Sequence, residues 1–109
     1  MIKNIDYAKV TNLIDEVTYQ DGQVVSKTIA KTKSANITLF AFDKDEGLST
    51  HTSTGDALVT VLDGKVKITI DNIDHVLTKG NSILMPANVP HALYGIEKFK
   101  MLLIISFGE

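Results

Sequence analysis

The sequence predicts an all-β fold, a β-sandwich or a β-barrel. Two observations carry this prediction: apolar and β-branched residues recur with a period of two over several short segments, and turn-forming residues separate these segments at regular spacing. The expected strands are residues 23–31, 36–43, 57–62, 65–70, 73–78, 82–85, 91–94 and 99–107. A chain of 109 residues suits one domain with a single hydrophobic core.

The N-terminal segment follows a different period. Val10, Leu13, Ile14 and Val17 recur at helical spacing. Residues 7–17 therefore predict one short helix that precedes the strands and packs on them as a lid.

The pair Asp71 and Asn72 predicts a two-residue hairpin turn between two of the strands. That turn places Ile70 opposite Ile73 and sets the register of the whole hairpin. In this register Ile68 faces His75 and Val66 faces Leu77. We therefore expect His75 on the apolar face of the hairpin, as a structural histidine rather than a catalytic base.

Composition excludes several classes of protein. With 44% hydrophobic and 22% charged residues, disorder is not expected. The chain has no cysteine, which excludes disulfides, thiolate catalysis and sulfur-ligated metals. The net charge is −2 and all 11 basic residues are lysines without a cluster, so no nucleic-acid partner is expected.

No membrane association is expected either. The longest apolar run covers only residues 101–105, far short of the roughly 20 residues that a membrane helix needs. The first residues lack the apolar centre of a signal peptide. Together with the absence of cysteine, these features predict a cytoplasmic protein.

Two blocks of sequence carry the most specific signal. The first, residues 47–64, contains His51, and the second, residues 80–95, contains Gly80, Pro86 and His91. Together they resemble the two motifs of the cupin superfamily, and residues 36–107 share the likeness. Asn88 stands where the family usually has glycine, and asparagine tolerates a left-handed backbone better than most residues.

The resemblance implies an antiparallel jelly-roll β-barrel, often built as a homodimer. Only residues 65–79 separate the two blocks, as in the shortest single-domain cupins. The implied organisation is one domain overall, in which an N-terminal helix and strands within residues 1–35 pack on a cupin-like barrel core formed by residues 36–109.

The first block departs from the pattern of metal-binding cupins, which supply His-x-His and a glutamate, joined by one histidine of the second motif. Here His51 and His91 match two of these four ligands, while Ser53 and Ala57 stand at the other two positions. The departure resembles small cupins with a His-x-x-x-Gly-Asp-Ala motif. Two imidazoles predict at most weak binding of a divalent metal such as Ni, Zn, Fe or Mn.

Asp56 is the candidate third ligand, next to the missing glutamate position. Strand alternation turns its side chain away from the barrel unless Gly55 bends the chain. A turn or backbone-amide hydrogen bond is the favoured role for this carboxylate.

Two functions follow from these residues. The first is a small-molecule-binding protein whose barrel pocket is lined by His51, Ser53, Ala57, Met85 and His91. The alternative, which the resemblance to cupins implies, is a metal-dependent enzyme of the dioxygenase or isomerase type that uses a weak two-histidine site. The fold alone does not decide between them, because this scaffold hosts many activities.

The expected partners are a small-molecule ligand and a second copy of the chain. The dimer follows from the family resemblance and from residues 37–42, which are apolar on both faces. A strand of that kind needs cover from its own barrel on one side and from a partner on the other.

Overall fold

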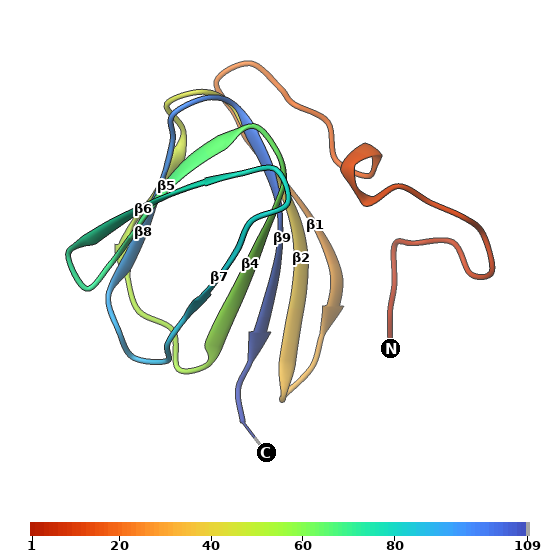
Figure 1. The fold of residues 1–109 in the computed structure, drawn as a ribbon. Coiled ribbons are helices and arrows are strands. Elements are labelled where there is room, and N and C mark those ends of the chain that lie inside the picture. Colours follow the sequence, from red (N-terminus) through yellow and green to blue (C-terminus); the bar gives the residue numbers. More distant parts are fainter. Residues whose placement is uncertain (109) are drawn as a thin grey trace.

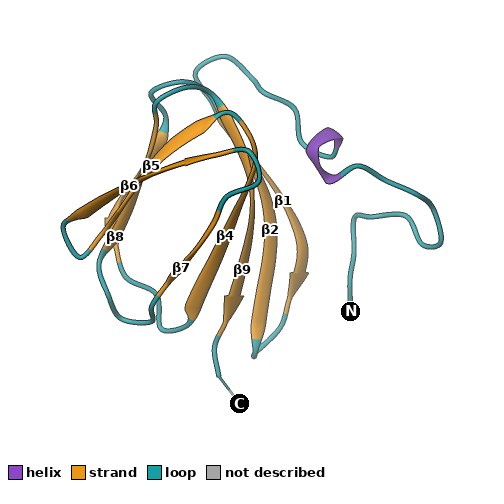
Figure 2. Cartoon of the chain, viewed as in Figure 1, coloured by secondary structure: helices purple, strands orange, loops and turns teal. Residues whose placement is uncertain are grey.

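The computed structural model describes residues 1–108, and it is nearly all strand (Figure 2). The elements, in chain order, are a 3-10 helix η1 (Leu13–Asp15) and nine strands: β1 (Val24–Lys31), β2 (Ala35–Phe42), β3 (Gly47–His51), β4 (Asp56–Asp63), β5 (Lys65–Ile70), β6 (Ile73–Thr78), β7 (Ser82–Met85), β8 (His91–Gly95) and β9 (Phe99–Ser106).

The strands form two antiparallel sheets that face each other across the core (Figure 1). One sheet has the order β1-β2-β9-β4-β7, and the other has the order β3-β8-β5-β6. Every paired neighbour within them is antiparallel. Consecutive strands β4 and β5 lie in different sheets, as in a jelly roll. The predicted jelly-roll barrel is therefore confirmed.

The β5–β6 hairpin has the predicted register. Ile70 pairs with Ile73 and Ile68 pairs with His75. Asp71 and Asn72 have φ angles of 49° and 65°, both in the left-handed region that a type I′ turn requires. The two turn residues thus set the register, and with it which side chains of this hairpin face the core.

The main core lies between the two sheets. Its centre is the stacked pair Phe42 and Phe99, whose ring centroids lie 4.4 Å apart and whose side chains are fully buried. Val59, Val61 and Ile68 are also fully buried within it. Core side chains of both sheets thus hold the barrel walls in place around the site described below.

A second apolar cluster lies on the outer face of the five-stranded sheet. Leu39 and Ala41 of β2 are fully buried there, although they point away from the main core. Part of the N-terminal segment covers them, including Val17 and the partly buried Leu13 and Tyr19. The N-terminal segment runs alongside β1, outside the barrel (Figure 1).

The helix predicted over residues 7–17 is not present, because only the single 3-10 turn η1 forms in this segment. Ala8 has a φ of 55°, and Asn12 is extended with φ −103° and ψ 117°, so no α-helix runs through the segment. Asn12 also makes no side-chain cap. Of the apolar residues at helical spacing, Leu13 and Val17 instead make separate contacts with the outer cluster, whereas Val10 is exposed.

Strand β3 was missing from the predicted strands. Its burial does not alternate, since Ser49, Thr50 and His51 are all exposed. Gly47 begins the strand where a Cβ atom would lie 2.0 Å from the carbonyl oxygen of Leu93, so only glycine permits this approach to β8. Within residues 1–108, no helix has the length and apolar character needed to span a membrane.

Candidate functional site

A cavity of about 160 Å³ lies between the two sheets. Residues from β3, β4, β7, β8 and β9, and from the loop after β3, form its wall. The lining consists of Leu48, His51, Thr52, Ser53, Ala57, Met85, His91, Leu93, Met101, Leu103 and Ile105.

The lining is apolar except along one side. Three of its four polar residues, His51, Thr52 and Ser53, follow one another in sequence, and His91 is the register partner of His51 on the neighbouring strand. His51 and Thr52 are exposed, whereas His91 is only 3% exposed. The polar side of the cavity is therefore also the side that reaches solvent.

The two histidine rings contact each other edge to face. Their Nε2 atoms are 3.1 Å apart, and their ring centroids are 4.3 Å apart. The Nδ1 atom of His51 lies 2.7 Å from the carbonyl oxygen of Ser49, and the Nδ1 atom of His91 lies 3.1 Å from that of Val89. Since a carbonyl oxygen only accepts, each Nδ1 carries a hydrogen and donates it. In the neutral rings both Nε2 atoms are therefore acceptors.

Burial lowers the pKa of the His91 imidazole below its usual value, and the adjacent His51 lowers it further. The hydrogen bond to the Val89 carbonyl opposes these effects but does not cancel them. At neutral pH the buried ring is accordingly held in its neutral form, with its Nε2 lone pair directed toward His51.

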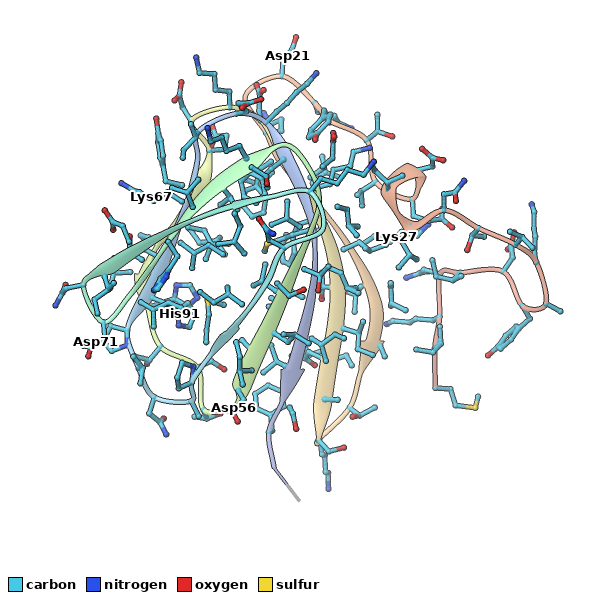
Figure 3. The ribbon with its side chains drawn as sticks, in the orientation of Figure 1. Asp21, Lys27, Asp56, Lys67, Asp71 and His91 are labelled. Carbon is cyan, nitrogen blue, oxygen red and sulfur yellow. The ribbon has the colours of Figure 1, made fainter. Side chains whose placement is uncertain are left out.

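The structure brings all five expected pocket residues to this one cavity: His51, Ser53, Ala57, Met85 and His91. Figure 3 shows His91 within the barrel. The Ser53 hydroxyl oxygen already accepts a hydrogen bond from the Gly55 N–H at 3.2 Å. Ala57 and Met85 are register partners on β4 and β7, and both are almost fully buried.

Asp56 does not join the histidines. It is exposed and lies one position before the buried Ala57, so its side chain points to the other face of β4. Figure 3 shows Asp56 at the end of this strand. Its carboxylate accepts the N–H of Ala87 at 2.8 Å. A second bond, from the Asn88 N–H to the Ser53 carbonyl at 2.7 Å, ties the same turn to the other side of the cavity. Asp56 thus anchors the turn that leads into His91, which is the role favoured from the sequence.

The donor set for a metal is consequently two imidazoles. Across residues 1–108, no three His, Cys, Asp or Glu side chains come together closely enough to hold an ion. The Ser53 hydroxyl is occupied by an amide, and Ala57 offers no donor. The residues present therefore do not fit the four-ligand centre of a metal-binding cupin.

Sequence reasoning missed six lining residues. Leu48 and Thr52 belong to β3 and the loop after it, which has no alternating pattern, and Leu93 lies on β8. The other three, Met101, Leu103 and Ile105, occupy alternate positions of β9 and share one face. The period of two in this strand was the signal that could have found them.

Comparison with known proteins agrees with this architecture. The model of the cupin domain family matches residues 38–105. The chain belongs to the cupin superfamily. No curated protein matches this cupin.

Solved structures give close likenesses to this cupin. A conserved protein of unknown function from Streptococcus pyogenes is 42% identical with a TM-score of 0.97, and the match covers 99% of this chain and 95% of that one. A cupin superfamily protein from Desulfitobacterium hafniense is 30% identical with a TM-score of 0.95, covering 99% of both chains. A cupin 2 conserved barrel domain protein from Leptotrichia buccalis is 44% identical with a TM-score of 0.86, covering 88% of this chain and 47% of that one.

Proposed function

We propose that this cupin binds a small, mostly apolar organic molecule in the barrel cavity, with the polar group of that molecule held by His51 and His91. The observation that carries the proposal is the division of the cavity wall. Seven apolar residues line most of it, and the four polar ones are gathered along one side. Sites for small molecules commonly combine an apolar wall with a few convergent polar groups.

The size of the cavity limits the ligand. An apolar protein cavity of about 150 Å³ is known to hold one benzene molecule. The cavity of about 160 Å³ therefore suits a body of roughly one six-membered ring. Larger molecules would have to extend past His51 into solvent.

Titration with toluene tests this proposal. Met85 and Met101 line the cavity, and the NMR signals of their methyl groups should shift in a saturable manner as toluene enters. Ala57→Met fills the cavity from a buried wall position and should abolish these shifts. Ala87→Met adds the same side chain outside the lining and should leave them intact. Absence of any saturable shift in the unmodified protein would contradict the proposal.

A metal-dependent enzyme is the second candidate function, and one distance favours it. Two nitrogen ligands on the same ion, with bonds of about 2.0–2.1 Å, lie about 2.9–3.4 Å apart when they occupy adjacent positions. The Nε2 atoms of His51 and His91 are 3.1 Å apart, and backbone carbonyls orient both rings through Nδ1. A stoichiometric metal after purification without a histidine tag, lost in His51→Ala, would favour this candidate.

We also propose that the protein pairs with a second copy through the outer face of the five-stranded sheet. Ile37, Ile104, Leu58 and Leu84 are successive register partners on β2, β9, β4 and β7, so they form one apolar row across four strands. Leu84 is 57% exposed and Leu58 is 38% exposed.

The outer face itself favours a second copy as the occupant. The row continues the apolar cluster around Leu39, where the N-terminal segment of the same chain already covers the sheet. The charged side chains on this face are engaged within the chain: Lys27 with Glu16, Lys100 with the Ile14 carbonyl and Asp56 with the Ala87 N–H. An uncharged apolar row can pack against the same row of a second copy across a two-fold axis. In such an interface each chain buries the apolar surface of the other.

A further inference from the structure

We propose that the cavity selects neutral molecules that carry a hydroxyl group on an apolar body, with phenol as the simplest example, over carboxylates and over bodies without a donor. This inference rests on the proposed function, because it names the ligand class of the same cavity. Two features carry it: the atoms that the histidine pair presents, and the charges of the cavity wall.

The histidine pair presents acceptors. Each Nδ1 hydrogen is engaged by a backbone carbonyl, of Ser49 for His51 and of Val89 for His91. The two Nε2 lone pairs therefore face each other at 3.1 Å, and two lone pairs repel at this distance unless a hydrogen lies between or beside them. A ligand O–H directed at the pair supplies that hydrogen. A carboxylate or an ether oxygen brings further lone pairs and forms no hydrogen bond with the Nε2 atoms.

The cavity wall carries no side chain to balance a charged ligand. The eleven lining residues include no lysine and no carboxylate. An anion would lose its hydration without an ion pair, and an ammonium group would lack a carboxylate partner, so both are disfavoured in an apolar cavity. A hydroxyl group carries no charge and can donate a hydrogen bond. It therefore suits both the Nε2 acceptors and a cavity wall without lysine or carboxylate.

Three probes built on one benzene ring separate these classes. Phenol and toluene differ in the hydroxyl group, and benzoate adds a charge. Each is titrated at pH 7.5 with a chelator present, so that no adventitious metal bridges the histidines, and the methyl signals of Met85 and Met101 report binding. We expect phenol to bind about three- to tenfold more tightly than toluene, the range for one net hydrogen bond. Benzoate should bind at least about tenfold more weakly than toluene.

Variants identify the atoms responsible. In His51→Leu one of the two Nε2 acceptors is removed, and the ratio of phenol to toluene affinity should fall while toluene still binds. In the double variant His51→Leu/His91→Leu both acceptors are removed, and the ratio should fall to about one. His91→Leu should behave alike, but its site is buried, so the exposed His51 position carries the test if the His91 variant does not fold. His75→Leu is the matched control, since it makes the same substitution at a histidine outside the cavity lining, and it should keep the preference.

The outcomes separate this inference from the proposed function. If no probe shifts the methionine signals, both are wrong. If toluene binds but phenol binds no more tightly, or benzoate binds most tightly, the hydroxyl preference is wrong and the apolar cavity stands. Loss of the preference in His75→Leu, or an undiminished preference in His51→Leu, would also overturn the inference.

Discussion

The Nε2 atoms of His51 and His91 lie 3.1 Å apart, although 40 residues separate these two histidines in the chain. The contact exists because β3 and β8 are antiparallel neighbours and His51 is the register partner of His91. Each ring is fixed from behind by a carbonyl two residues earlier in the chain. The sheet thus supplies a pair of oriented imidazoles without any acidic side chain to hold them.

The histidine pair should contribute little to stability. His51→Leu changes an exposed residue and should alter the free energy of unfolding by less than about 1 kcal/mol. His91→Leu leaves the Val89 carbonyl without its donor, at a cost of about 1–3 kcal/mol, partly offset by the apolar side chain. Ile68→Ala, at a fully buried core position, should cost about 2–5 kcal/mol. Urea denaturation checks this order, and two histidine variants as unstable as Ile68→Ala would make the pair a structural element.

Asp43 should make stability depend on pH at the acid end. Its carboxylate accepts the N–H groups of Gly22 at 2.6 Å and of Lys44 at 2.8 Å, and these bonds lower its pKa below the usual value. A lowered folded-state pKa gives stability that is present above the unfolded-state value, about 3.9, and is lost as the pH falls through the folded-state pKa. The stability difference between wild type and Asp43→Asn should therefore be largest near neutral pH and shrink below about pH 4.

Denaturation curves from pH 2 to 7 measure this difference. Asp21→Asn is the control, because it removes a nearby exposed carboxylate from the same turn region. A difference between wild type and Asp43→Asn that grew toward low pH would contradict the role assigned to Asp43.

The apolar row on the outer sheet should decide the oligomeric state. Leu84→Lys places a charge on the exposed end of the row, and light scattering should then give a monomer while the circular dichroism spectrum is unchanged. Ile73→Lys makes the same change at a residue of similar exposure on the other sheet and should leave a dimer. A wild-type protein that scatters as 11.9 kDa at micromolar concentration would contradict the dimer itself.

Features set by local chemistry were predictable from the sequence. The hairpin at Asp71 and Asn72 follows from turn chemistry, and the gathering of His51 and His91 at one cavity was expected from the resemblance to known motifs. The prediction of an N-terminal helix was wrong. Helical spacing alone does not reveal that a residue such as Ala8 adopts a left-handed conformation. Tertiary contacts with the sheet determine the conformation of that segment, and no local sequence pattern indicates these contacts.

The ring orientations were also beyond sequence reasoning. They depend on the carbonyls of Ser49 and Val89, and a backbone carbonyl carries no signature in the sequence. Strand β3 was missed for a related reason, since its residues are mostly exposed and polar, and its pairing with β8 rather than its own pattern makes it a strand.

Restoring the absent metal ligands should convert the cavity into a strong metal site. Ser53→His and Ala57→Glu together place two further donors in the wall that already holds His51 and His91. The affinity for nickel or zinc should rise by more than the about 10–100-fold that outer partners of metal ligands contribute, because these are ligands themselves. Calorimetry on the double variant and the wild type measures the gain.

The matched control places the same two side chains outside the cavity. Thr54→His with Val76→Glu introduces them at exposed positions outside the lining, and should leave metal affinity at the weak wild-type level. The buried glutamate at position 57 is costly without an ion, so the cavity variant should also gain thermal stability on adding metal, and the control should not. Equal metal affinities in the two double variants would mean that Ser53 and Ala57 do not face His51 and His91 across one cavity.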